Sequence, residues 1–356
     1  MEEASRAPVL VVPHSSPAAQ RADQLFGSRD DTRIVAPGRH FTDLVGVLTR
    51  DRPRALYVVD LGRDTALLTL VARLLGISVI LDTGDLVYEL ERSRGARSRA
   101  GLASVWLGEH LSLRLARAVV VRGRVHEALL QGRKVTFAPD LAPRGARPVS
   151  GDIVRARLGL EGVFVAGLVG SLHPAPRLGI AYGWDLVEAL SSAPVGVHAL
   201  IVGDGPARPA LEARAAEIGV ASRCHFAGSV PPHEVAPWVG AMDVAVSTQT
   251  NDRVGAVRTT AKLPLYLACG CPVLASDVGE AKRLLGPLGW TIQYDGVVDR
   301  TYPYRLATEL ARWAADRAGA PLRREQALRL HREAFDERIV RERIWDTVER
   351  VLAGTC

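Results

Sequence analysis

The sequence contains few cysteines, four among 356 residues. Cys269 and Cys271 stand close together, but no second cysteine pair or histidine cluster accompanies them. A disulfide framework and a zinc site are therefore both disfavoured, and no metal site is expected. Two glutamates follow the initial methionine, where a secretory signal would be basic, and Arg73 interrupts the apolar run 66–81. These features predict a cytoplasmic protein without a membrane span.

Three motifs that accompany common α/β enzymes are also missing. The first strand–helix turn lacks GxGxxG, which disfavours a nicotinamide enzyme. The chain has no GxxxxGK[ST] loop, which argues against a phosphate-loop NTPase, and no GxSxG elbow, which argues against a hydrolase of that kind.

The positive charge is unevenly placed along the chain. Residues 1–150 contain 22 Lys and Arg against 16 Asp and Glu, whereas residues 151–356 contain 23 of each kind. The densest cluster comprises Arg92, Arg94, Arg97 and Arg99, in a Ser/Gly/Ala-rich stretch that we interpret as a mobile loop. Such a patch can meet acidic lipid, an acidic protein or nucleic acid, or it can simply be solvated. Nucleic acid is the weakest of these options because no aromatic residues are interleaved with the arginines.

Unbroken apolar runs alternate with helical patterns along most of the chain. This alternation predicts an α/β protein with parallel sheets, whose strands are covered on both faces. The expected strands are 8–13, 32–37, 55–60, 77–82, 118–121, 135–138, 163–169, 197–202, 224–227, 243–247 and 272–276. Expected helices include 64–75, 107–117, 124–131, 182–190, 210–218, 261–269, 305–318 and 322–352, with one more inside 233–242.

A Pro- and Gly-containing stretch at 141–150 separates two such series and has the character of a linker. We therefore expect two doubly wound, Rossmann-like domains and a helical tail. The expected boundaries are 1–145 for the first domain, 151–330 for the second, and 331–356 for a C-terminal helix.

The stretch 258–280, RTTAKLPLYLACGCPVLASDVGE, predicts a helix entered from a polar loop. Thr260 can cap its first turn, and Gly270 can end it in the left-handed conformation. Free amides near Thr260 and Ala261, with Arg258 and Lys262 beside them, would form an anion site. The alternative is an ordinary helix start with two solvated charges.

Other polar loops are expected at the same edge of the second sheet, beyond the carboxyl ends of its strands. They are Ser171, the tight turn 203–206 and the turn 228–231. In doubly wound sheets ligands bind at this edge.

The ordered series FVAGLVGSLHPAPRLG, LIVGDGP, HFAGSVPPHEVAPWVGAMDVAVS and TTAKLPLYLACGCPVLASDVGE resembles the donor domain of retaining, family-4 type glycosyltransferases. The N-terminal half is similar only in pattern. The resemblance implies a GT-B fold: two Rossmann-like domains that face a cleft, with C-terminal helices crossing back to the first domain.

The resemblance also implies roles for individual residues of the donor domain. Gly170 matches the family glycine, whereas Ser171 stands at the arginine position and Arg177 at the lysine position. We expect Arg177 and Lys262 to neutralise the leaving diphosphate, with Lys262 replacing the lost cation. The two glutamates typical of the family are replaced by Val257 and Leu265.

In the first domain, Gly84 stands where the family often has a histidine, and Asp85 after it matches. Asp85 is therefore the third candidate catalytic residue. Ser15 and Ser16 replace a glycine pair of the first loop, and together with His14 they are the expected acceptor-binding residues.

The hypothesis is a metal-independent glycosyltransferase that moves a sugar from a nucleotide-diphosphate donor to a hydroxyl or amine of an acceptor. It needs no cofactor beyond the co-substrate, for which UDP is the expected nucleotide. The acceptor is unknown; it could be membrane-linked, carrier-linked or a small natural product. Alternatives are a nucleotide-sugar epimerase or phosphorylase, and a non-catalytic relative that binds a nucleotide or a partner. The expected donor-binding residues are Gly170, Ser171, Gly203, Asp204, Gly205, Gly228, Ser229, Val230, Arg258, Thr259, Thr260 and Ala261.

Overall fold

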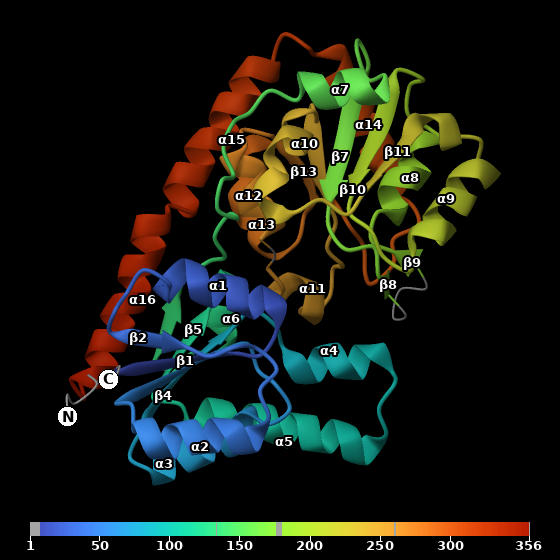
Figure 1. Cartoon of the computed structure of the whole chain (residues 1–356). Helices are drawn as coiled ribbons and strands as arrows, with labels where there is room; N and C mark the ends of the chain where they lie inside the picture. Colours follow the sequence, from blue (N-terminus) through green and yellow to red (C-terminus); the bar gives the residue numbers. More distant parts are fainter. Residues whose placement is uncertain (1–7, 133, 176–179, 260, 356) are drawn as a thin grey trace. The chain divides into compact units, whose positions relative to one another are not determined.

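The computed structural model describes residues 8–132, 134–175, 180–259 and 261–355, which form two compact units. Unit 1 comprises Met1–Leu141, Val257–Thr259 and Glu337–Cys356 (Figure 1). Unit 2 comprises Ala142–Ala256 and Thr260–Asp336. The last segment of the chain therefore belongs to the same unit as the first.

Unit 1 is built on a six-stranded sheet in the order β2-β1-β3-β4-β5-β6, in which every pairing is parallel. Its inner strands are rich in Val, Ile, Leu and Ala because both faces are covered. The strands are β1 Val9–Pro13, β2 Thr32–Ile34, β3 Ala55–Val59, β4 Ser78–Thr83, β5 Ala118–Val121 and β6 Val135–Phe137.

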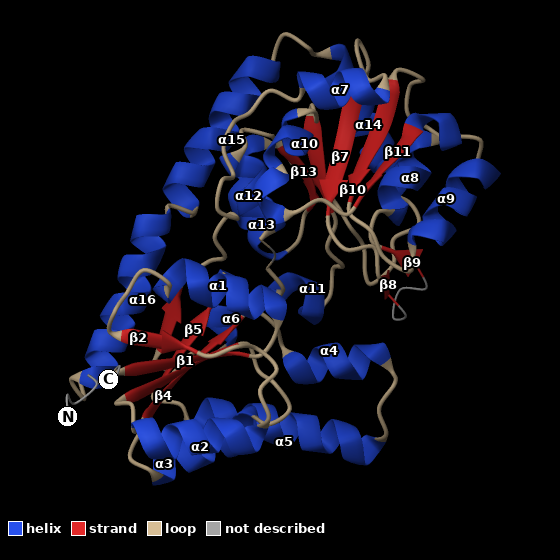
Figure 2. Ribbon diagram, in the orientation of Figure 1, coloured by secondary structure: helices blue, strands red, loops and turns tan. Residues whose placement is uncertain are grey.

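Two layers of helices cover this sheet. Val9 and Val11 belong to a core with α1 (Ser16–Phe26) and α16 (Glu337–Leu352), whereas Leu10 and Val12 belong to a core on the opposite face. That second core includes residues of α2 (Phe41–Asp51) and α3 (Thr65–Leu74), which lie with α5 (Arg99–Leu115) on one side of the sheet (Figure 2). The remaining helices of the unit are α4 Val87–Arg94 and α6 Arg124–Leu129.

Unit 2 contains a second parallel sheet of six strands, in the order β11-β10-β7-β12-β13-β14. A short antiparallel pair, β8 with β9, follows β7. The strands are β7 Phe164–Val169, β8 Pro174–Ala175, β9 Ile180–Ala181, β10 Val197–Val202, β11 Cys224–Gly228, β12 Val244–Ser247, β13 Val273–Ser276 and β14 Thr291–Ile292.

One continuous apolar core joins this sheet to its helices. The α-helices are α7 Asp152–Leu158, α8 Trp184–Leu190, α9 Arg208–Glu217, α10 Ala236–Gly240, α11 Arg253–Val257, α12 Lys262–Ala268, α13 Gly279–Leu285, α14 Tyr302–Ala315 and α15 Ala320–Ala334. Single 3₁₀ turns are η1 Ala221–Arg223, η2 Pro232–Glu234 and η3 Gly286–Leu288. The two sheets confirm the predicted α/β class with two doubly wound, Rossmann-like halves.

The arginine cluster expected in a mobile loop lies instead on two helices and the short turn between them. Glu89 pairs with Arg92, and Glu91 with both Arg94 and Arg97. Pairs three residues apart stabilise a helix without any apolar periodicity, which is why α4 escaped the sequence analysis. Ser98 accepts a hydrogen bond from the amide of Gly101 and starts α5 eight residues earlier than expected.

Three further elements differ from the expectations. β2 ends at Ile34, short of the expected 37, because it is an edge strand with one neighbour. Helix α11 lies directly before the stretch 258–280 and was not among the expected helices. The expected helix 322–352 is divided into α15 and α16, since Phe335 leaves helical geometry (φ −129°) and its side chain is buried in the core of unit 2. None of the helices in the described part of the chain is long and apolar enough to cross a bilayer.

Candidate functional site

Three turns meet at the carboxyl ends of β7, β10 and β11 in unit 2. The amide of Gly170 donates to the carbonyl oxygen of Val202 at 2.9 Å, and that of Gly203 donates to Gly228 at 2.8 Å. Leu172 likewise donates to Asp204 at 3.0 Å. Backbone contacts therefore tie together the loops that the sequence placed at this sheet edge.

Glycine is required at Gly203 because two chains pass very close there. A Cβ atom at this position would lie 1.9 Å from the carbonyl oxygen of Gly170, and φ is 138°, where L side chains are rarely found. Gly205 approaches Leu172 in the same way, with its hypothetical Cβ atom 2.4 Å from that carbonyl oxygen. The glycines thus form a floor of bare backbone at the sheet edge.

The side chain of Lys262, the first residue of α12, extends over this floor. A Cβ atom on Gly170 would lie 2.8 Å from its Cε and 3.0 Å from its Nζ. The Nζ atom also lies 3.4 Å from the centroid of the Tyr182 ring, a cation–π contact. A cation contributed by α12 is therefore held at the carboxyl end of β7, next to the family glycine position.

Two tyrosines, half-buried Tyr182 and buried Tyr266, accompany Lys262. Tyr266, on α12, accepts a hydrogen bond from the amide of Val169 at 2.7 Å and so ties that helix to β7. Burial raises the pKa of both Tyr182 and Tyr266, so both hydroxyls stay neutral, and the Tyr182 ring attracts the ammonium through its π face.

Some of the remaining candidate donor-site residues of unit 2 are exposed or half-buried, and others fall outside the described residues. Ser171 and Ser229 are exposed and Val230 is half-buried. Asp204 accepts a hydrogen bond from the amide of Gly205 and forms an ion pair with Arg208 at 3.2 Å. Arg177 and Thr260, with its predicted cap, fall outside the described residues. Helix α12 begins at Lys262, one residue later than expected, and Ala261 precedes it as an exposed residue without a side-chain cap.

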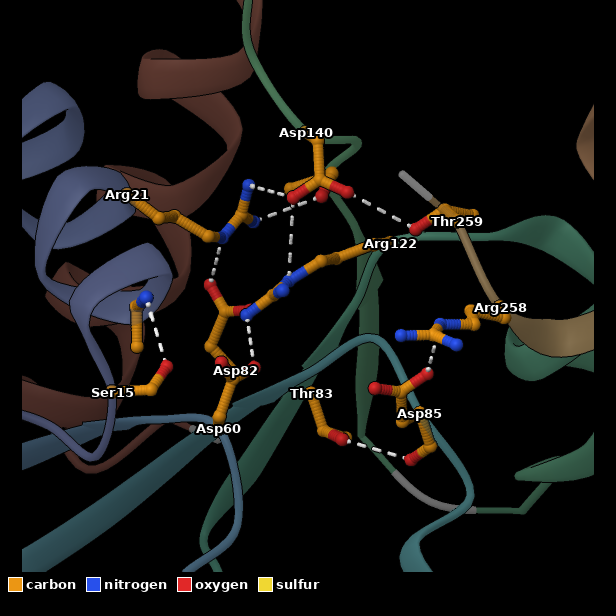
Figure 3. A network of polar contacts seen from close by, with 12 residues as sticks. Ser15, Arg21, Asp60, Asp82, Thr83, Asp85, Arg122, Asp140, Arg258 and Thr259 are labelled. Atoms are coloured by element: carbon orange, nitrogen blue, oxygen red, sulfur yellow. Dashed lines mark hydrogen bonds and ion pairs between the residues drawn. The ribbon is translucent and has the colours of Figure 1, made fainter. Parts of the chain in front are cut away.

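Arg258 and Thr259 belong to unit 1, whereas Lys262 belongs to unit 2. Arg258 pairs with Asp85 (Nε to Oδ1, 3.5 Å), and Thr259 donates to Asp140 at 3.2 Å (Figure 3). The two cations expected to flank one helix start are therefore distributed between the two units. Val257 and Leu265, at the two glutamate positions, are buried apolar residues.

Unit 1 has a buried ionic network that the sequence analysis did not find. Asp82, with no exposed surface, accepts hydrogen bonds from Arg21 (2.8 Å), Arg122 (3.0 Å) and the hydroxyl of Tyr57 (2.8 Å). Arg122 also pairs with Asp60 at 2.5 Å. The network lies at the carboxyl ends of the strands, beside Asp85 (Figure 3).

The charges in this network shift one another's pKa. Burial alone would raise the pKa of Asp82, but Arg21 and Arg122 outweigh it and hold that pKa below its ordinary value. Burial raises the pKa of Asp60, and Arg122 counters this only in part. A signal was present in the sequence: Arg21 stands on the apolar face of α1, between Ala18 and Leu25, where a charge needs a buried partner.

The expected acceptor-binding residues of the first loop have local structural partners. Ser15 caps α1 by accepting a hydrogen bond from the amide of Ala18 at 3.2 Å, and Ser16 is the first residue of that helix. His14 contacts the hydroxyl of Thr65 (2.9 Å), and burial lowers the pKa of its imidazole. Their role towards an acceptor stays a prediction.

Among the described residues, no group of three or more His, Cys, Asp or Glu side chains is arranged to hold a metal ion. The expected independence from metals stays a prediction.

Residues 163–314 match the family model of "Glycosyl transferases group 1". The chain is 34% identical over 143 residues to 2-deoxystreptamine glucosyltransferase of Streptomyces kanamyceticus, which is 40% of this chain and 35% of that protein. It is 32% identical over 188 residues to D-inositol 3-phosphate glycosyltransferase of Thermobispora bispora, 49% of this chain and 42% of the relative. The chain thus spans less than half the length of the curated relatives it matches.

Solved structures match over nearly the whole chain. Anabaena Alr3699/HepE in complex with UDP and glucose has a TM-score of 0.73 at 16% identity, covering 96% of this chain and 99% of that one. Sucrose-phosphate synthase from Thermosynechococcus elongatus has a TM-score of 0.70 at 17% identity, covering 97% and 89%. At such identities the likeness establishes the fold. By fold, family model and curated relatives together, the chain is similar to the GT-B glycosyltransferases of the family-4 kind.

Proposed function

We propose that the protein transfers a sugar from a nucleotide-diphosphate donor, held by unit 2, to a hydroxyl or amine of an acceptor held by unit 1. The observation that carries the proposal is the ammonium of Lys262 over the Gly170 backbone at the carboxyl end of β7. The glycine floor beside it admits a ligand close to the main chain, and ligands of doubly wound sheets bind at this edge.

The chemistry needs stabilisation of one developing charge. The bond between the anomeric carbon and the diphosphate oxygen breaks, the acceptor oxygen or nitrogen bonds to that carbon, and the acceptor proton passes to the diphosphate. Negative charge grows on the leaving diphosphate, where Lys262, with Arg177 as second cation, lowers the barrier. Helix α12 is short, so its dipole contributes less than these side chains. With two cations in place the reaction needs no metal, and the resemblance implies retention of configuration.

UDP is the nucleotide best supported for the donor, because Alr3699/HepE has been solved with UDP and with UDP-glucose. The curated relatives named for transfer to 2-deoxystreptamine and inositol phosphate support a small polar acceptor. On unit 1, Asp85 and the first loop with His14 are the residues we propose for that acceptor. The proposed setting is the cytoplasm.

A non-catalytic nucleotide-binding relative is the second candidate, favoured by the buried apolar side chains of Val257 and Leu265 at the glutamate positions. The candidate functions can be distinguished by incubating the protein with UDP-glucose or UDP-N-acetylglucosamine, each with and without 2-deoxystreptamine or inositol phosphate. UDP release that requires acceptor and survives a chelator supports the transferase. Calorimetric binding of UDP without turnover supports the non-catalytic relative, and an epimer or sugar phosphate formed from donor alone supports an epimerase or phosphorylase. The absence of both UDP binding and turnover would contradict the proposal.

A further inference from the structure

Helix α3 of unit 1 exposes leucines on the side that faces away from its sheet. It packs on the sheet through Leu68 and Ala72, which are fully buried. Leu67, Leu70 and Leu74 lie on the opposite side and are 54%, 38% and 79% exposed. A surface helix ordinarily carries polar residues there, so this apolar outer side is a departure that packing within unit 1 does not explain.

Helix α5 presents a similar outer side next to α3. Trp106 and Leu107 are 45% and 58% exposed. The helix packs beside α3, and its Leu113 lies against the same core as Leu68 of α3. Both helices lie on the same side of the sheet (Figure 2), so their exposed residues are on one side of unit 1.

Helices α3 and α5 carry more positive than negative charge. Helix α3 contains no acidic residue, and the single acid of α5, Glu109, accepts hydrogen bonds from the amides of Val87 and Tyr88 at 2.9 and 3.0 Å. Arg99 and Arg114 are exposed on α5, and neither forms an ion pair with any carboxylate that the structure describes. The two helices thus combine exposed Leu and Trp side chains with exposed arginines.

We propose that this α3–α5 surface, comprising Leu67, Leu70, Leu74, Trp106, Leu107, Arg99 and Arg114, docks on the surface of an anionic lipid bilayer. Leucine and tryptophan side chains enter the boundary between headgroups and acyl chains, and arginines bind lipid phosphates. Charge argues against a second copy as occupant, since a two-fold contact would bring two arginine-bearing surfaces together. The proposal does not depend on the transferase activity.

Vesicle sedimentation with the full chain tests the proposal. Vesicles of phosphatidylcholine mixed with an equal part of phosphatidylglycerol should bind the protein, and binding should weaken as salt rises. Vesicles of pure phosphatidylcholine should bind it at least about tenfold less. Leu107→Glu, Leu74→Glu and the double variant Arg99→Glu/Arg114→Glu should each reduce binding to the mixed vesicles by about tenfold or more.

Matched controls come from unit 2. Ile153 is 85% exposed on α7, and Arg300 is exposed ahead of α14. Ile153→Glu and Arg300→Glu should bind the mixed vesicles as the wild type does, and thermal unfolding checks that every variant is folded. Absence of wild-type binding, equal binding to both lipid mixtures, or equal losses in the control variants would overturn the proposal. A wild-type dimer that Leu107→Glu converts to monomer, with vesicle binding unchanged, would overturn it too and assign the surface to self-association.

Discussion

The ammonium of Lys262 lies 3.4 Å from the centroid of the Tyr182 ring, above the backbone of Gly170. These residues come from the start of α12, the segment before α8 and the end of β7, so the sheet edge assembles them from distant parts of the sequence. Lys262 can take this position because residue 170 is a glycine. The Cβ atom of any other residue there would lie 2.8 Å from the Cε atom of Lys262.

Replacing Lys262 with alanine should lower turnover with a nucleotide-sugar donor by about 10²–10³-fold, because the developing diphosphate charge loses a preorganised partner. Steady-state UDP release measures the effect. Lys282→Ala is the matched control, since Lys282 lies on α13 of the same unit and pairs with Asp277 at 2.9 Å. Turnover in Lys262→Ala within a factor of about two of the control would remove Lys262 from the mechanism.

We expect the Tyr182 ring to position Lys262. Two substitutions can distinguish this role of the ring from a role of the hydroxyl group. Tyr182→Phe keeps the π face and should retain near-normal kcat. Tyr182→Leu removes a contact that contributes about 0.5–2 kcal/mol, which corresponds to a loss of about 2- to 30-fold in kcat. A merely structural role would give equal losses in the two variants, or losses that appear in the melting temperature and not in kcat.

The buried network around Asp82 should be a large contributor to the stability of unit 1. Asp82→Asn leaves Arg21 and Arg122 without their central carboxylate, and breaking a buried ionic cluster in this way costs about 3–5 kcal/mol. Urea unfolding measures the free energy. Asp31→Asn is the control: its pair with Arg29 is exposed, so a change within about 1 kcal/mol is expected.

The same network predicts an acid limit to stability. The pKa of Asp82 is below its ordinary value, so the unfolded chain takes up the proton before the folded protein does as pH falls. The stabilisation is complete above about pH 4, the ordinary range of an aspartate, and is lost at lower pH as the folded-state pKa is passed. Asp82→Asn should flatten this part of the stability curve. An unchanged acid slope in the variant would show that other groups control it.

Sequence reasoning succeeded where the signal is local. Most inner strands are apolar runs, such as Ala55–Val59, because both of their faces are buried. It failed for α4, whose stability comes from Glu89–Arg92 and similar pairs rather than from an apolar stripe. Composition had suggested a mobile loop for the same residues.

The site was only partly predictable because its contacts are long-range. Gly203 and Lys262 were found, since a glycine turn after a strand and a cation at a helix start are visible in the sequence. Asp82 and Arg21 are 61 positions apart, and only the folded sheet brings them together. Arg258 looked like a companion of Lys262 on sequence spacing, yet its side chain pairs with Asp85 in unit 1. Chain proximity does not determine which unit a loop residue joins.

Gly203→Ala should destabilise unit 2 strongly, because the new methyl group would lie 1.9 Å from the carbonyl oxygen of Gly170 at a φ of 138°. Relief of that clash requires β7 and β10 to separate at their carboxyl ends, so we expect a loss of about 3 kcal/mol or more. Gly196→Ala is the matched control, since a Cβ atom there meets no atom within 4 Å. Urea unfolding of both variants gives the difference, and calorimetry with UDP reports whether the glycine floor still accepts the nucleotide. Equal stability of the two variants would mean that the turns of β7 and β10 are not held in contact in solution.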